Sequence, residues 1–134
     1  MGRKVIVAED DPVMGGVVHA ALEAAGHEVI AVAPTAEDAL TLALSADPEV
    51  VVMDVNLAGR MNGIEAARRM RRRLHCAVVF HTAHTDRDHR EQMAALRDAT
   101  VVTKPGDIGR LAAAVADAPS AEAPAAEAQG LLDD

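Results

Sequence analysis

The sequence contains almost no aromatic residues: tryptophan and tyrosine are absent, and Phe80 is the single phenylalanine. A core built around aromatic rings is therefore excluded, and we expect a tightly packed aliphatic core of Val, Leu, Ile, Met and Ala. The chain has 134 residues and is about half apolar, which is the size of one domain with a single core.

Cysteine is nearly absent as well. Cys76 is the one thiol, so an intrachain disulfide is excluded and a reducing compartment is favoured. It lies in the apolar run Cys76–Phe80, which predicts a buried core thiol rather than a nucleophile.

Long apolar runs are also missing. None approaches the roughly 18 residues that a membrane span needs. Arg3 and Lys4 lead into a four-residue apolar run and then into acidic residues, which is not the pattern of a signal peptide. We therefore expect a soluble cytoplasmic protein.

Basic charge is too sparse and too local to predict nucleic-acid binding. The net charge is -8, and five acids without a base follow residue 116, which leaves 16 acids and 13 bases before that point. The one basic cluster predicts a solvated helix face, with a patch for an acidic partner as the alternative. It comprises the arginines at positions 68, 69, 71, 72 and 73.

Five short apolar runs, rich in β-branched residues, predict strands that are buried on both faces. They are Val5–Ala8, Val29–Val32, Val50–Met53, Ala77–Phe80 and Val101–Val102, of which the last looks short.

The first helix is predicted to begin with Asp11 as its N-cap and Pro12 in its first turn, and to end at Gly26. This register places four apolar residues on one side: Val13, Val17, Ala21 and Ala25.

Four further helices are predicted between the later strands. Thr35 can cap the second, and Asp47-Pro48 stops it. The others are expected over residues 63–73, 86–97 and 107–116, the last with Ile108, Leu111 and Val115 facing inward.

The resulting βα alternation, repeated five times, predicts an α/β fold: a doubly wound, flavodoxin-like three-layer sandwich. Parallel strands need crossover connections, which place helices on both faces of the sheet. The strand order expected at this size is 2-1-3-4-5. A long glycine-rich phosphate loop is absent from the sequence, which disfavours a Rossmann or P-loop nucleotide site.

Several predicted strands end in residues that can take part in chemistry. Glu9, Asp10 and Asp11 follow the first strand, and Asp54 follows the third. The fourth leads to His81 and Thr82, and the fifth to Lys104. In a sheet of this kind, ligands bind beyond the carboxyl ends of the strands.

Clustered carboxylates repel one another unless a cation neutralises them. Mg²⁺ prefers oxygen ligands and keeps part of its water shell, so it is the expected ion, with Mn²⁺ as an alternative. The ammonium of Lys104 and the hydroxyl of Thr82 would suit an incoming phosphate-type anion, with Asp54 as its nucleophile.

In this order and spacing, the residues resemble the receiver domains of two-component response regulators. The resemblance covers about residues 3–117. It rests on the acidic pair in VAEDD, Asp54 in VVMDVNL, Thr82-Ala83 in VVFHTAH, Lys104-Pro105 in VVTKP, and the βα repetition.

The resemblance implies that Asp54 accepts a phosphoryl group from a sensor histidine kinase or a histidine phosphotransfer protein. Asp10 would bind Mg²⁺ directly and Glu9 would bind it through water, while Asp54 and the backbone carbonyl of Asn56 complete the ligands. Lys104 would hold one phosphoryl oxygen, and Thr82 with the backbone N–H of Ala83 would hold another. Asp11 would be a surplus acid that caps the first helix.

The resemblance also implies roles for two further residues and identifies two departures. Asn56 and His84 occupy the positions that tune the lifetime of the phosphoryl group. Val101 stands where the family commonly has an aromatic residue, so an aromatic rotamer switch cannot operate. The loop from Leu57 to Gly63 is one residue longer than the common form.

We therefore expect a receiver domain over residues 1–117 and a flexible acidic tail over residues 118–134. It would act as a stand-alone phosphoacceptor rather than an enzyme, by binding a downstream protein or relaying phosphate, as a monomer or a weak dimer, without nucleic acid or membrane. Two alternatives remain: a scaffold that never takes phosphate, and an aspartyl-phosphate phosphohydrolase. Asn56 disfavours the hydrolase, because such enzymes carry an Asp at that position.

Overall fold

Five parallel strands form one sheet in the order β2-β1-β3-β4-β5. In this computed structural model, which describes residues 2–83, 86–104, 106 and 108–119, the predicted flavodoxin-like α/β fold is confirmed. The strands are β1 Lys4–Ala8, β2 Glu28–Ala33, β3 Val50–Met53, β4 Ala77–Thr82 and β5 Ala99–Thr103.

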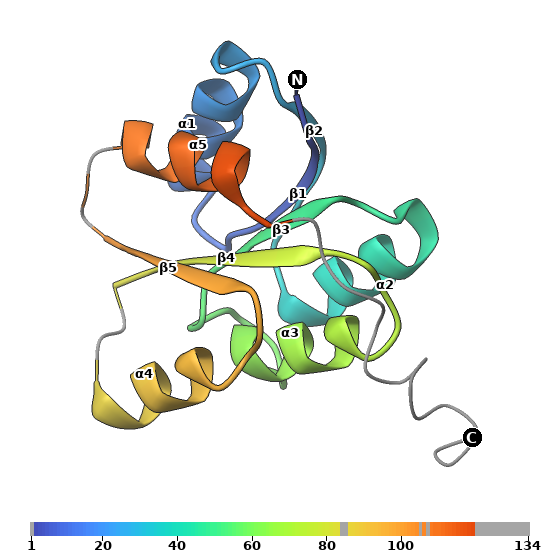
Figure 1. The fold of residues 1–134 in the computed structure, drawn as a ribbon, viewed down its shortest axis with the longest axis vertical. Coiled ribbons are helices and arrows are strands. Elements are labelled where there is room, and N and C mark those ends of the chain that lie inside the picture. Colours follow the sequence, from blue (N-terminus) through green and yellow to red (C-terminus); the bar gives the residue numbers. More distant parts are fainter. Residues whose placement is uncertain (1, 84–85, 105, 107, 120–134) are drawn as a thin grey trace.

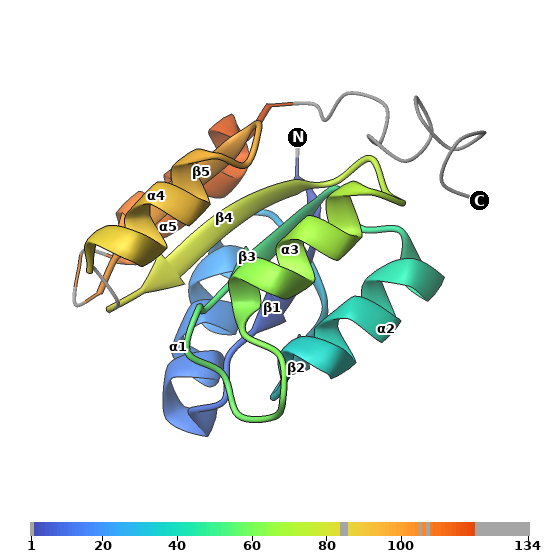
Figure 2. The same cartoon turned by 90° about the horizontal axis from the view of Figure 1, so that it is seen from below.

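Helices cover both faces of the sheet. Figure 1 shows α1 and α5 above the sheet and α2, α3 and α4 below it, and Figure 2 shows these three from below. The helices are α1 Pro12–Ala24, α2 Ala36–Ala46, α3 Gly63–Arg71, α4 Arg87–Ala94 and α5 Ile108–Asp117.

The core consists of two apolar layers, because successive side chains of a strand point to opposite faces. In β3, Val51 and Met53 face the layer formed with α2, α3 and α4, whereas Val50 and Val52 face the layer formed with α1 and α5. Phe80 is fully buried among aliphatic side chains. Apart from Phe80, both layers are built from non-aromatic apolar side chains, as the composition predicts.

The helix caps follow local side-chain chemistry. Asp11 accepts hydrogen bonds from the N–H groups of Val13 and Met14, at 2.9 and 3.4 Å, and Pro12 lies in the first turn. Thr35 caps α2, and Asp47 ends it in the left-handed conformation with φ of 52°. The predictions made for these caps are confirmed.

The prediction that every strand is buried on both faces is wrong for β2 and β5. Both are edge strands, with a neighbour on one side only. In β5 only Val102 is buried, and Val101 is 43% exposed. β5 is also longer than predicted, because its pairing with β4 extends it over Ala99–Thr103.

The apolar side predicted for α1 is not its buried side. Val13 and Val17 are 76% and 46% exposed, whereas Gly15, Val18 and Leu22 face the core. Packing against the sheet and α5 therefore selects a different stripe of the helix. On α5 the prediction is confirmed for Leu111 and Val115, which are buried, while Ile108 is partly buried.

Candidate functional site

Backbone hydrogen bonds continue past the strand ends and position the polar residues there. The N–H of Glu9 donates to Ala33 at 2.9 Å, and the N–H of Asp54 donates to Ala8 at 3.1 Å. The N–H of Lys104 donates to Thr82 at 2.9 Å. These bonds thus hold Glu9, Asp54 and Lys104 in fixed positions just beyond the ends of β1, β3 and β5.

Lys104 connects two of the acids. Its Nζ lies 2.6 Å from Oε1 of Glu9 and 2.9 Å from Oδ2 of Asp54. Both carboxylates are buried, with 5% of Glu9 and 8% of Asp54 exposed. Burial acts to lower the pKa of Lys104, but the hydrogen bonds to Glu9 and Asp54 and their charges outweigh it, so the pKa is raised. Lys104 is therefore charged at neutral pH.

Glu9, Asp10 and Asp54 form a cluster of acidic oxygens. One carboxylate oxygen from each lies within 4.8 Å of the others, with Glu9 and Asp54 buried and Asp10 exposed. Hard oxygen donors on the open edge of a sheet fit Mg²⁺, which keeps several waters when it binds to proteins. The chemistry of this donor set therefore fits the predicted ion.

The loop after β3 turns back against Asp54. The N–H of Asn56 donates to Oδ1 of Asp54 at 3.3 Å, and the N–H of Gly63 donates to the carbonyl of Val55 at 2.9 Å. A Cβ at Gly63 would lie 2.0 Å from the carbonyl oxygen of Asp54. The start of α3 therefore packs directly on the backbone of Asp54, and only glycine fits there.

Thr82 is the last residue of β4, at the same edge of the sheet, and Ala83 follows it directly. Thr82 is fully buried and pairs in register with Thr103 of β5, whereas Ala83 is exposed. His84, for which we predict a modulating role, lies outside the described residues, as does Pro105. Asp11 caps α1 and is not part of the acidic cluster.

His81, one of the residues predicted at the strand ends, is buried at this edge of the sheet. It is 4% exposed, and its Nδ1 has no hydrogen-bond partner among the described residues. Burial lowers its pKa to about 4, and the charge of Lys104 acts in the same direction while Asp54 opposes it. His81 is therefore neutral at pH 7. In the sequence, the one indication that His81 is buried is its place directly after the apolar run Ala77–Phe80.

Residues 5–116 match the model of the response regulator receiver domain. The chain belongs to this family. The receiver domain is the phosphoacceptor module of two-component signalling, so the family fits an acidic cluster with a lysine at the carboxyl edge of the sheet.

Individual similar proteins agree with this assignment. The receiver domain is 36% identical over 107 residues to a protein-glutamate methylesterase/protein-glutamine glutaminase of Haloarcula marismortui, covering 78% of this chain and 29% of that protein. It is 30% identical over 113 residues to the transcriptional regulatory protein PdtaR of Mycobacterium tuberculosis, covering 84% of this chain and 55% of that protein. The chain thus spans about a third to a half of these relatives.

Among solved structures, the receiver domain is similar to a DNA-binding response regulator of the LuxR family from Staphylococcus aureus. The TM-score is 0.81 at 24% identity, and the match covers 87% of this chain and 98% of that one. At this identity, the likeness supports the fold alone.

Cys76 is buried in the core, as predicted, and burial raises the pKa of its thiol to about 11. In the part of the chain that the structure describes, every helix is too short or too polar to cross a bilayer.

Proposed function

We propose that this receiver domain accepts a phosphoryl group on Asp54 from a sensor histidine kinase or a histidine phosphotransfer protein. The observation that carries the proposal is the double contact of Lys104, whose Nζ bridges Asp54 and Glu9 beside the acidic cluster. The site thus combines a buried nucleophile, a fixed positive charge and a set of oxygen ligands.

The chain's own residues supply position and charge in this reaction. Asp54, Glu9, Asp10 and the carbonyl of Asn56 would hold Mg²⁺, which neutralises negative charge on the transferring group when it is bound. A carboxylate oxygen of Asp54 forms the bond to phosphorus while the bond from phosphorus to the histidine nitrogen breaks and the imidazole leaves.

Lys104, Thr82 and Ala83 would stabilise the transferred group. Lys104 already contacts Asp54 at 2.9 Å, so its ammonium can pass to a phosphoryl oxygen without a large movement. The Thr82 hydroxyl and the Ala83 N–H lie at the end of β4 on the same edge and would donate to a second oxygen. Asn56 and His84 would then set how long the phosphoryl group lasts.

The phosphorylated form would signal by binding a downstream protein or by passing the group to another protein. A protein-binding scaffold that is never phosphorylated is the alternative. The buried contacts among Lys104, Asp54 and Glu9 favour the phosphoacceptor, because a scaffold has no need to bury two carboxylates around one ammonium.

Intact-mass spectrometry after incubation with Mg²⁺ and acetyl phosphate tests the proposal. The wild type should gain one phosphoryl group that is labile to base, and Asp54→Asn should gain none. Asp117→Asn, at the exposed end of α5, is the control that should behave as the wild type. A wild type that gains no mass and binds no beryllofluoride would support the scaffold instead.

A further inference from the structure

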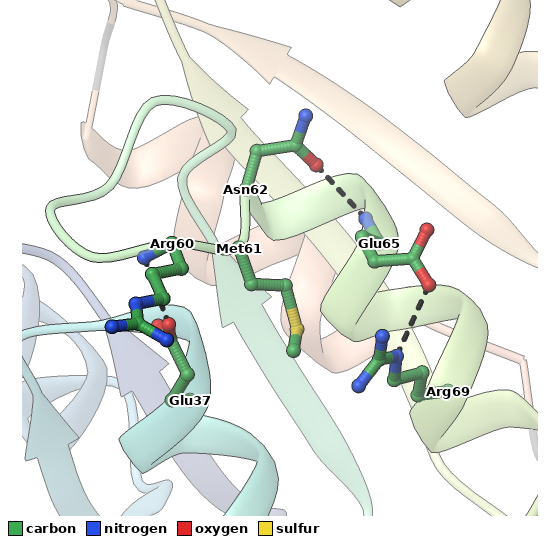
Figure 3. A pocket seen from close by; sticks show the side chains of 6 residues that line it. All are labelled: Glu37, Arg60, Met61, Asn62, Glu65 and Arg69. Carbon is green, nitrogen blue, oxygen red and sulfur yellow. Dashed lines mark hydrogen bonds and ion pairs between the residues drawn. The ribbon is translucent and has the colours of Figure 1, made fainter.

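The loop that follows Asp54 is attached to the neighbouring helix α2. We define residues 55–62 as the site loop, because it begins next to Asp54 and carries Asn56. A pocket of about 410 Å³ lies between this loop, the start of α2 and one side of α3. Figure 3 shows its lining residues: Glu37, Arg60, Met61, Asn62, Glu65 and Arg69.

Three contacts join the site loop to the segment that begins α2. A parallel β-bridge pairs Ala58 with Thr35. The N–H of Arg60 donates to Oε2 of Glu37 at 2.8 Å. The carboxylate of Glu37 also lies directly against Gly59, where a Cβ would be 2.6 Å from Oε1.

Gly59 is suited to this close approach. Its φ of +106° belongs to a backbone conformation that glycine adopts without strain, and it has no side chain to displace Glu37. The loop is thereby shaped around the carboxylate.

The carboxylate of Glu37 is charged at neutral pH. The hydrogen bond from the Arg60 backbone is the largest cause that lowers the pKa of Glu37, and the guanidinium of Arg60 acts in the same direction. A hydrogen bond to an ionised acceptor is stronger than one between neutral groups. The contact is therefore suited to hold the middle of the loop.

We propose that Glu37 is a positioning residue for the metal ligands of the site loop. Hydrogen bonds from Asn56 to Asp54 and from Gly63 to Val55 fix the ends of the loop. Glu37, together with the bridge between Ala58 and Thr35, fixes its middle. Loosening the middle would leave the carbonyl of Asn56 less well oriented toward the ion. This inference rests on the proposed function, because it assigns that carbonyl to Mg²⁺.

The inference is tested on the full chain with Glu37→Ala, Glu37→Gln and Glu65→Ala. Glu65 is the matched control, because it lines the same pocket but pairs with Arg68 and Arg69 of its own helix. Amide hydrogen exchange at Arg60 is measured without metal. Mg²⁺ affinity is measured by calorimetry, and the phosphorylation rate by mass spectrometry across Mg²⁺ concentrations.

In Glu37→Ala, we expect the Arg60 amide to exchange faster and Mg²⁺ to bind about 10-fold more weakly, as when an outer partner of a metal ligand is removed. The phosphorylation rate should return to the wild-type value at saturating Mg²⁺. Glu37→Gln keeps a carbonyl acceptor and should restore most of the affinity. Glu65→Ala should match the wild type in all three measurements.

Faster exchange with unchanged Mg²⁺ affinity would overturn the positioning role, and so would unchanged exchange. A wild type that binds no Mg²⁺ would overturn the proposed function together with this inference. The two failures are distinguishable, because the first appears in the variant and the second in the wild type.

Discussion

Glu9 and Asp54 are buried carboxylates, and a buried charge is destabilising unless another charge compensates it. Lys104 supplies that charge from the end of β5 and reaches both acids. His81 lies beside this group as a neutral imidazole, because burial and the charge of Lys104 disfavour its protonated form. At the scale of residues, one ammonium therefore offsets only part of the negative charge of the acidic cluster, which leaves a reason for a cation to bind there.

Burial of His81 should make the free energy of unfolding depend on pH. The folded-state pKa is about 4, against an ordinary value of 6.5, so the unfolded chain binds a proton more readily between these values. The stability gained by burying His81 in its neutral form is fully present above pH 6.5 and is lost as the pH falls from there toward 4. We expect a loss of about 1 kcal/mol between pH 7 and pH 5, allowing for screening by solvent.

Urea denaturation at pH 7 and pH 5 measures this loss. His81→Leu should lose less stability over the interval than the wild type, since leucine fills the buried position and cannot titrate. Equal losses in the wild type and in His81→Leu would contradict the prediction.

At the scale of elements, a helix can demand glycine where it meets the sheet and tolerate a larger residue on its exposed side. Gly63 begins α3 against the backbone of Asp54, whereas Gly16 in α1 has open space around it. A side chain is therefore excluded at Gly63 and has room at Gly16. The reason is the approach of α3 to β3 at the site.

Alanine substitutions at these two glycines should change stability in opposite directions. In Gly63→Ala the Cβ would lie 2.0 Å from the carbonyl oxygen of Asp54, so we expect a destabilisation of about 2 kcal/mol or more. In Gly16→Ala nothing lies within 4 Å, and we expect a stabilisation of about 0.5 to 1 kcal/mol. Urea unfolding of both variants measures the difference, and a loss of equal size in both would refute this packing argument.

At the scale of the whole molecule, the parallel topology collects all the strand carboxyl ends at one edge. β1 and β3 are neighbours in the sheet although α1, β2 and α2 separate them along the chain. This arrangement places Asp10 close to Asp54. Mg²⁺ binding to that cluster would stabilise the folded chain as a unit, because the unfolded chain has no such site.

We therefore expect Mg²⁺ to raise the melting temperature of the wild type by a few degrees. At ten times its dissociation constant, an ion that binds only the folded state contributes about 1.4 kcal/mol. Asp10→Asn should lose most of this increase. Asp11→Asn should keep it, because Asp11 caps α1 and asparagine is an equally good N-cap.

Thermal denaturation with Mg²⁺, and with sodium salt at the same ionic strength, measures this effect. The comparison of adjacent acids separates metal binding from general screening of negative charge. An equal response in Asp10→Asn and Asp11→Asn would exclude the specific site.

Sequence alone predicts the order of the elements, the helix caps and the positions of polar residues at the strand ends. These features depend on local chemistry: Asp11 and Thr35 bond to backbone groups within three residues, and valine-rich runs favour buried strands. The predicted order of the sheet followed from the alternation of these elements.

Which groups come into contact depends instead on how the whole chain packs. Lys104 contacts residues 50 and 95 positions away, and Glu37 meets Arg60 across two elements, so no local pattern shows either contact. The buried stripe of α1 also differs from the predicted one, because packing on the sheet and α5 sets its rotation. Hydrogen bonds between residues close in the chain can be predicted from the sequence, whereas long-range contacts depend on how all the elements pack together.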